Sequence, residues 1–355
     1  MSGPTIAIAT NQGTLGGGEV MLLSIAAALE ELGHEVLVIG PAVPGDLLDQ
    51  ARSRGLRILA LPGASRRRYA AALLAWRLRH RGIPLWCNGL LPSLATAGLG
   101  PRIVHLHRRP TGAGSAAARL AGRGARWVLV PSEDLARAVP GARVLPNWTE
   151  EIPRRAPRDA GDGPLRVGFL GRLTREKGAD LLLRAMAPVI ARSERGITVV
   201  LAGENRFGRA RDDAALAAAL APVAAHVERP GWIARDAFLA DVDLVVVPSR
   251  GPESFGLVVA EAMAAGVPVV VTDAGALGEV VGPEHPWIAR RDDAADLAAV
   301  IERALSEIAA GDEQRAARAR RRWEAEYSPA AGSGRVAALL GSAPAVARPT
   351  GEEAP

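Results

Sequence analysis

The 355-residue sequence contains one cysteine, Cys87, and one lysine, Lys177. A single cysteine excludes an internal disulfide bond. Aromatic residues make up only 4% of the chain, so its cores must be built from alanine, leucine and valine, for which a hydrophobic fraction of 48% is ample. No apolar run approaches the roughly 18 residues that span a bilayer, and no signal-type segment precedes the first apolar strand. We therefore expect a cytoplasmic protein.

The scarcity of lysine draws attention to the one position that keeps it. Of the 43 basic residues, 42 are arginine. A lysine retained in such a chain is a candidate for a role that needs a compact ammonium group rather than a planar guanidinium. Chance retention is the alternative.

Positive charge is concentrated in the first half of the chain. Residues 1–150 hold 17 arginines and 9 acidic residues, a net charge of +8, and the remainder carries −3. The basic stretch at residues 66–81 is amphipathic, which is compatible with peripheral contact with an anionic membrane or with a surface helix whose arginines cover apolar neighbours. Membrane contact would place the protein at the inner face of the membrane. We expect no nucleic-acid partner.

Short apolar strands alternate with helical stretches in two separate series, a pattern that predicts βαβ units and parallel sheets. A stretch rich in proline, glycine and charge separates the two series at residues 151–163. The predicted fold class is therefore α/β, with two Rossmann-like doubly wound domains facing across a cleft. They cover residues 1–150 and 164–320, and residues 343–355 are expected to form a disordered tail.

Two glycine-containing turns are candidates for anion binding. Gly16-Gly17-Gly18-Glu19 opens the first helix, where free backbone N–H groups can meet an anion; a tight turn with Glu19 complementing the helix dipole is the alternative. The second turn, residues 171–178, carries Arg172 and Lys177 between a strand and a helix. A forked guanidinium and a point charge on one loop can neutralise a diphosphate without a metal.

A third motif, at residues 248–263, places two carboxylates at the start of another helix. Glu253 lies in the loop after a strand, and Glu261 lies about two turns into the helix that follows. A carboxylate beside a phosphate site is unfavourable unless it serves a hydroxyl-rich group, which indicates a sugar. The anion itself would meet the backbone N–H groups that open this helix, namely those of Phe255, Gly256 and Leu257.

Two patterns resemble metal sites, and neither is complete. His105 and His107 share one face of a strand, but no nearby carboxylate or cysteine completes a set of ligands. We expect a structural role for His105, whereas His107 is a candidate catalytic residue that contacts the sugar or the acceptor hydroxyl. Asp241-Val242-Asp243 begins a strand and is interpreted as structural. We expect no metal and no other cofactor.

Taken together, residues 166–282 resemble the donor domain of the GT-B retaining glycosyltransferases of family GT4. The first half matches more thinly, through residues 16–19, His107 and Pro146-Asn147, where Trp148 replaces the family's usual glycine. The matching pieces of the second half are Gly171-Arg172-Leu173-(x)4-Gly178 with Lys177, Leu201-Ala202-Gly203-Glu204, Asp243 to Ser249, Glu253-(x)7-Glu261, Gly266 to Val270 and Gly275-(x)3-Glu279.

This resemblance implies a role for each matching residue. Arg172 and Lys177 would hold the donor diphosphate, and Glu253 would contact the sugar hydroxyls and orient the anomeric carbon. Glu261 would bind the ribose, and the backbone at Gly17 would approach the donor from the other domain. Family members transfer with retention, usually without a metal, and the departing phosphate oxygen is thought to help deprotonate the acceptor.

The resemblance also implies that a helix at residues 321–342 crosses back to the first domain. The expected reaction moves a hexose from a nucleotide sugar, most simply one linked to UDP or GDP, to a hydroxyl of a glycan, a lipid-linked acceptor or a small molecule. Cell-envelope or natural-product glycan synthesis would use such a step. A catalytically silent scaffold that binds nucleotide sugar or lipid, and a nucleotide-sugar epimerase, are the alternatives.

Overall fold

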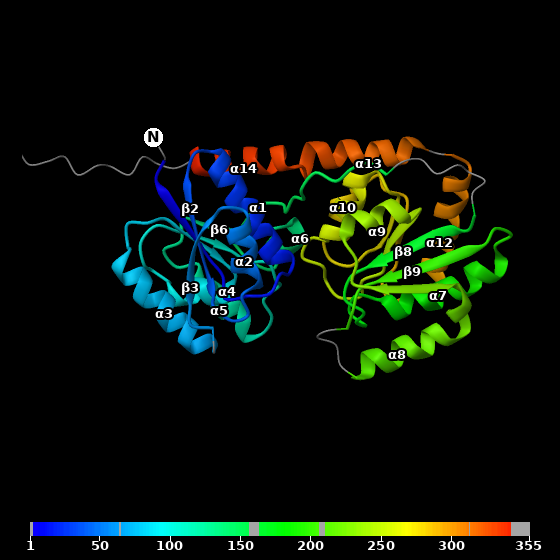
Figure 1. The fold of residues 1–355 in the computed structure, drawn as a ribbon, viewed down its shortest axis with the longest axis horizontal. Coiled ribbons are helices and arrows are strands. Elements are labelled where there is room, and N and C mark those ends of the chain that lie inside the picture. Colours follow the sequence, from blue (N-terminus) through cyan, green and yellow to red (C-terminus); the bar gives the residue numbers. More distant parts are fainter. Residues whose placement is uncertain (1–2, 64, 156–162, 206–209, 312, 342–355) are drawn as a thin grey trace, which may run out of the picture.

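The computed structural model describes residues 3–63, 65–155, 163–205, 210–311 and 313–341. The described chain forms two α/β lobes, each built around one parallel sheet (Figure 1). The predicted fold class is confirmed. None of the described helices is long and apolar enough to cross a membrane.

The sheet of the first domain has seven parallel strands in the order β3-β2-β1-β4-β5-β6-β7. The order reverses direction between β1 and β4, and ligands of open α/β sheets bind at such a point, beyond the carboxyl ends of the strands. The strands are β1 (Thr5–Ala9), β2 (Glu35–Pro41), β3 (Arg57–Leu61), β4 (Leu85–Asn88), β5 (Arg102–His105), β6 (Trp127–Val130) and β7 (Arg143–Val144). The helices are α1 (Gly17–Glu31), α2 (Asp46–Ser53), α3 (Arg66–Arg79), α4 (Leu90–Ala95), α5 (Ala113–Ala121) and α6 (Glu133–Ala136).

The second sheet repeats this topology with six parallel strands in the order β10-β9-β8-β11-β12-β13, so its own reversal lies between β8 and β11. The strands are β8 (Leu165–Leu170), β9 (Ile197–Ala202), β10 (Val227–Gly231), β11 (Leu244–Val247), β12 (Val269–Thr272) and β13 (Ile288–Ala289). The helices are α7 (Ala179–Arg192), α8 (Ala210–Leu220), α9 (Arg235–Asp241), α10 (Leu257–Ala265), α11 (Leu277–Val281) and α12 (Ala294–Ala309), with a 3-10 turn at Ala221–His226.

Hydrophobic periodicity explains which strands could be predicted. The central strands are buried on both faces, as expected for parallel sheets covered by helices, and therefore read as continuous apolar runs. β10 has no such signal, because this edge strand has the sequence Val-Glu-Arg-Pro-Gly and is largely exposed. The sequence analysis accordingly missed it.

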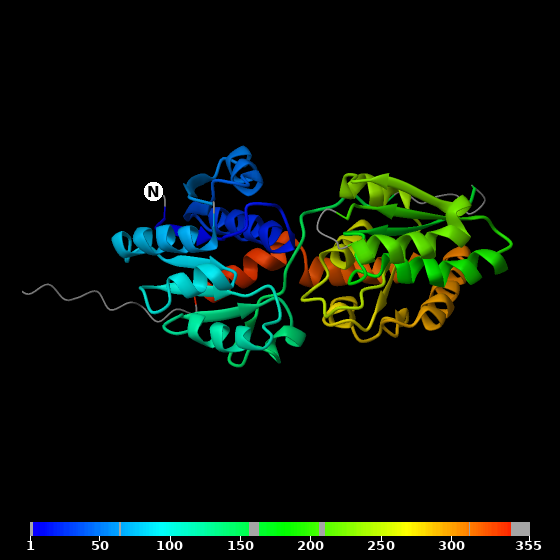
Figure 2. The same ribbon diagram turned by 90° about the horizontal axis from the view of Figure 1, so that it is seen from below.

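The C-terminal segment crosses from the second domain back onto the first. Two helices, α13 (Glu313–Glu326) and α14 (Pro329–Gly341), run along one side of the molecule (Figure 1), whereas the sequence predicted one helix at residues 321–342. Trp323 donates from Nε1 to Thr149 Oγ1 at 2.8 Å, and Trp148 packs against Gly332 with no room for a β-carbon. Through these contacts the C-terminal segment packs against residues 148 and 149, at the end of the first domain. The two lobes that the segment connects lie side by side in Figure 2.

Two predicted segments lie wholly or partly outside the described residues. The tail expected at 343–355 is among them, as are residues 156–162 of the predicted linker. The preceding part of the linker is anchored to the second domain, because Arg155 donates from its backbone N–H to Ala265 O at 2.9 Å and pairs with the Asp243 carboxylate.

Candidate active site

Helix N-termini from both domains meet at the points where the strand order of each sheet reverses. α1 and α10 begin after β1 and β11, and each has a glycine N-cap, Gly16 and Gly256, with no side chain capping it. A β-carbon added to Gly17 would lie 3.2 Å from Leu257 Cδ1, so the two first turns touch across the cleft. The positive ends of two helix dipoles therefore converge on one region suited to an anion.

Lys177 and Glu253 meet beside these helix ends. Lys177 Nζ donates to Glu253 Oε1 at 2.6 Å, and Ser249 Oγ donates to the same oxygen at 2.5 Å. The Lys177 side chain is 28% exposed and that of Glu253 is 15% exposed. The pair is therefore half-buried, held between the loop after β8 and the loop after β11, and still open to a ligand. Sequence analysis named both residues, and the structure brings them into contact.

Glycines fix the loops that carry this pair. Gly178, the N-cap of α7, has φ +79°, and a β-carbon there would lie 1.9 Å from Pro248 O. Gly275 has φ +63°, and its β-carbon would lie 2.4 Å from Glu253 O. Only glycine combines a left-handed backbone with such close approach. The backbone of the Lys177 loop therefore packs directly on the loop that follows β11.

The remaining residues predicted to bind the diphosphate are placed unequally. Arg172 is exposed and has no hydrogen-bond partner among the described residues, so its guanidinium is available to a ligand. Phe255 is buried and packs edge-to-face on Tyr327, with ring centroids 5.4 Å apart. Its side chain is structural, and any contact with a ligand would come from its backbone. Gly256 has φ +99°, a backbone conformation that favours glycine, and there α10 begins.

Glu261 is largely buried and paired. Its carboxylate lies 3.4 Å from Arg235 Nη1, and the side chain is 12% exposed. Burial raises the pKa of Glu261, while the charge of Arg235 opposes that rise. Arg235 in turn approaches Glu150 Oε2 at 3.9 Å, at the start of the connection between the domains. Sequence analysis missed Arg235, which lies 26 residues from Glu261 and belongs to none of the motifs.

His107 lies on the other side of the cleft, beside the first turn of α1. Its Nε2 is 2.7 Å from Asn88 Oδ1, and Asn88 Nδ2 donates to Gly18 O at 3.0 Å. Because the amide nitrogen serves Gly18, the Asn88 oxygen is the acceptor, and His107 carries its proton on Nε2. Burial lowers the pKa of His107 to about 4, so the ring is neutral at physiological pH. His105 packs against it with the two rings tilted by 43° and their centroids 4.1 Å apart, and His105 is fully buried.

The pKa of Glu19, in the first turn of α1, is also perturbed. Burial raises the pKa of its carboxyl to about 7, although Thr10 Oγ1 donates to Oε1 at 3.3 Å. The side chain folds back towards Gly16, whose added β-carbon would lie 3.2 Å from Glu19 Oε2. This position is typical of a carboxylate three residues into a helix that covers the N-cap. Glu19 thus belongs to the structure of the turn.

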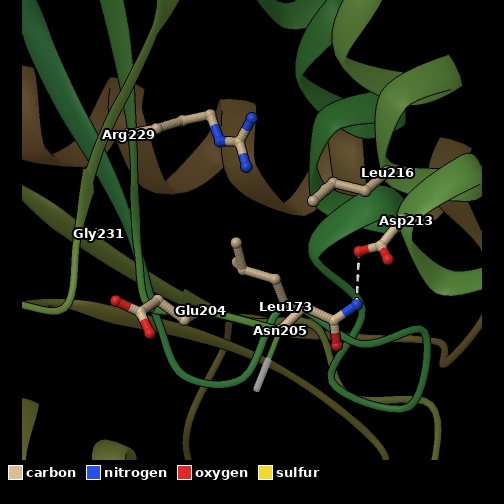
Figure 3. A pocket seen from close by; sticks show the side chains of 8 residues that line it. Leu173, Glu204, Asn205, Asp213, Leu216, Arg229 and Gly231 are labelled. Atoms are coloured by element: carbon tan, nitrogen blue, oxygen red, sulfur yellow. Dashed lines mark hydrogen bonds between the residues drawn. The ribbon is translucent and has the colours of Figure 1, made fainter. Parts of the chain in front are cut away.

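A pocket adjoins the loop of Arg172 in the second domain (Figure 3). Its volume is about 390 Å³. Arg229 on β10 and Leu216 on α8 flank it from opposite sides, with Leu173 between them (Figure 3). Leu173 directly follows Arg172, so the pocket opens one residue from the predicted phosphate contact. It is lined by Leu173, Gly203, Glu204, Asn205, Asp213, Leu216, Arg229 and Gly231.

No group of three or more histidine, cysteine or acidic residues in the described part of the chain could hold a metal ion. Both carboxylates of the Asp241-Val242-Asp243 sequence are paired with arginines. Asp241 pairs with Arg166 Nη2 at 2.7 Å, and Asp243 accepts from Arg166 N at 2.7 Å and pairs with Arg155. These carboxylates tie the start of β11 to its neighbour β8 at the centre of the sheet.

Two parallel doubly wound domains, with a cation–carboxylate pair and glycine-capped helix N-termini where the strand order of each sheet reverses, have the architecture of the GT-B transferases. Family models agree: residues 164–307 match "Glycosyl transferases group 1", and residues 15–154 match "Glycosyltransferase Family 4". The chain belongs to this family of glycosyltransferases, and the resemblance predicted from the sequence is confirmed.

Relatives of known name support the assignment. The lipopolysaccharide core biosynthesis mannosyltransferase LpsB of Rhizobium meliloti is 29% identical over 82% of this chain and 84% of its own. A D-inositol 3-phosphate glycosyltransferase of Rhodococcus erythropolis is 40% identical over 43% of this chain; that match spans about a third, 34%, of the relative. Among solved structures, Anabaena HepE in complex with UDP and glucose has a TM-score of 0.82 at 20% identity, covering 95% of this chain and 99% of its own.

Proposed function

We propose that this protein is a retaining glycosyltransferase that moves a hexose from a UDP- or GDP-linked sugar to a hydroxyl of a glycan, a lipid-linked acceptor or a small molecule. The observation that carries the proposal is the Lys177–Glu253 pair beside the converging N-termini of α1 and α10. The relative LpsB is named a mannosyltransferase, and the HepE structure contains UDP and glucose.

The diphosphate would lie between the two helix N-termini, where Arg172 and Lys177 supply positive charge. An exposed guanidinium and a half-buried ammonium can stabilise the charge that develops on the departing phosphate, which is the role a metal plays in other transferases. We therefore propose transfer without a metal. The pocket beside Leu173 would take the nucleotide base, and Glu261 would accept hydrogen bonds from the ribose.

The sugar would lie over Glu253, with the acceptor approaching from the first domain. Glu253 already accepts from Lys177 and Ser249, so its carboxylate is fixed to accept from sugar hydroxyls as well. His107 cannot donate a second proton, because it is neutral and its Nε2–H serves Asn88. Its Nδ1 is buried and has no hydrogen-bond partner among the described residues, so His107 would contribute by holding Asn88 and the first turn of α1 in place rather than by contact with a hydroxyl.

Product stereochemistry tests the proposal. The protein is incubated with α-linked UDP- and GDP-hexoses and a panel of sugar acceptors, and the anomeric proton of the product is followed by NMR. We expect an α-linked product, the configuration of the donor. An inverted product would contradict retention, and interconversion of the donor without transfer would support the epimerase alternative.

We also propose that α3 contacts an anionic membrane. Its outward face, here called the α3 face, consists of Arg67, Ala71, Leu74 and Leu78, which follow helical spacing, and exposed Arg81 lies in the turn after the helix. Leu74 is 37% exposed and Leu78 44% exposed, between exposed arginines at both ends. Arg77 does not take part, because it is buried and donates to the carbonyls of four backbone residues, Leu99, His80, Ile83 and Pro101.

Sedimentation with vesicles tests this contact. We expect salt-sensitive binding to vesicles that contain anionic phospholipid and none to neutral vesicles. Replacing Leu74 and Leu78 by serine should weaken binding, whereas Leu120→Ser on α5, at a leucine that is 50% exposed, should not. Equal binding by both variants would contradict a role for the α3 face.

A further inference from the structure

A carboxylate from the second domain is bound to backbone N–H groups of the first. Glu279, on α11, accepts from Glu133 N at 2.9 Å through Oε1 and from Asp134 N at 3.2 Å through Oε2. The two donors follow β6, 146 and 145 residues away in sequence. Two charge-assisted hydrogen bonds therefore join the domains across the cleft.

On its own side, this carboxylate is tied to the loop that carries Glu253. Ala276 N, three residues before Glu279, donates to Glu253 O at 2.9 Å, and Gly275 pairs with Glu253 as an isolated parallel bridge. The other side of Glu279 is anchored to the crossing segment, because Arg322 on α13 donates to Glu279 O at 3.0 Å. Its backbone is thus held between the sugar-binding loop and α13.

In the first domain, Asp134 is in turn bound to the loop that follows β5. Arg109, two residues after His107, donates to the backbone oxygen of Asp134 at 3.1 Å and pairs with its carboxylate. One continuous set of contacts therefore runs from the Glu253 loop through Glu279 and Asp134 to the loop of His107. These are the two loops that must face each other for transfer.

We propose that Glu279 is a positioning residue that closes the cleft, setting the acceptor-side loop of His107 against the donor-side loop of Glu253. Breaking its two hydrogen bonds would open the domains for exchange of donor and product, a gating role common to enzymes with closing domains. The catalytic part of this inference rests on the proposed transferase function, whereas the closure itself does not.

Two variants test the contact from opposite sides. Glu279→Gln turns an amide N–H towards the donors and leaves one oxygen to accept. Glu133→Pro deletes one donor at the first position of α6, where proline is tolerated and the extended Ser132 suits a following proline. The controls are Glu133→Ala, which keeps the N–H, and Glu284→Gln, at a glutamate whose side chain is 81% exposed.

Small-angle X-ray scattering and steady-state rates are measured on the full chain with saturating UDP or GDP. We expect both test variants to show a larger radius of gyration than both controls. We also expect kcat to fall about tenfold while the nucleotide Kd stays within about twofold, as for loss of a closed-state contact. Equal radii in test and control variants would overturn the inference, whatever the rates. Absence of turnover in the wild type would contradict the proposed function, and scattering would still decide the closure.

Discussion

Lys177 Nζ and Glu253 Oε1 lie 2.6 Å apart although 76 residues separate them in the sequence. The chain has no other lysine, and this one is placed against a carboxylate at the point where two helix N-termini converge. The pair joins the loop after β8 to the loop after β11, the two strands between which the second sheet reverses. In the proposed transferase the pair would unite a charge for a diphosphate with an acceptor for sugar hydroxyls.

Removing the ammonium should disable transfer. For Lys177→Ala we expect kcat/KM to fall about 10²- to 10³-fold, because a preorganised charge at the departing phosphate is lost and Glu253 loses its partner. Lys177→Arg should recover only part of the rate, since a planar guanidinium does not fit a site shaped for a compact group. Nucleotide release is the readout. Arg175→Ala, at an exposed position of the same loop, is the control and should stay near the wild-type rate.

Arg235 should control how Glu261 binds the donor. Arg235→Ala leaves Glu261 buried without a cation, so the pKa of Glu261 should rise further and its neutral form should gain population. We expect weaker donor binding in calorimetry, and a larger loss at pH 6 than at pH 8. Arg235→Lys should restore much of the affinity. An affinity that is unchanged at both pH values would contradict a role for Glu261 as an ionised ribose ligand.

Glu19 should make folding stability depend on pH. Its folded pKa of about 7 lies above the ordinary glutamate value of 4.5, so the folded state holds a proton that the unfolded state has released. The contribution of Glu19 to the free energy of unfolding is complete below about pH 4.5 and is lost as pH rises through about 7. Relative to Glu19→Gln, the wild type should lose on the order of 3 kcal/mol of unfolding free energy across that interval.

The measurement is urea unfolding of both proteins between pH 4.5 and 8. A difference between them that does not change with pH would show that Glu19 keeps an ordinary pKa.

Gly178 should tolerate no side chain. Its φ is +79°, and a β-carbon would meet Pro248 O at 1.9 Å, so Gly178→Ala should cost at least about 2 kcal/mol and shift Lys177 away from Glu253. Gly266→Ala is a matched control with φ +70° and no atom within 4 Å of the added carbon. It should cost only about 1 kcal/mol, from backbone strain alone. Similar losses for both variants, measured by urea unfolding, would contradict the packing argument.

Much of the donor site could be predicted because its chemistry follows strand ends. Arg172, Lys177, Glu253 and Glu261 lie directly after apolar strands or early in helices, where the order of elements alone places them on one edge of a sheet. Their actual partners could not be predicted. Nothing in the sequence indicated that Lys177 would contact Glu253.

The contacts between the domains leave even less trace in the sequence. Glu279 binds backbone N–H groups, which every residue except proline carries, so no side-chain pattern marks Glu133 or Asp134 as its partners. Asn88 had only a faint signal, an Asn-Gly step at the end of a strand. The contact of Glu279 depends on the relative placement of two sheets, and that of Asn88 on the packing of β4 against α1, neither of which periodicity specifies.

Release of nucleotide from a panel of UDP-, GDP-, ADP- and TDP-hexoses tests the central claim most directly. The wild type should release nucleotide slowly from one donor class without an acceptor and faster with one, and both Lys177→Ala and Glu253→Gln should abolish that release while still folding. Binding of a nucleotide sugar with no release from any donor, or release that is unchanged in both variants, would contradict the account.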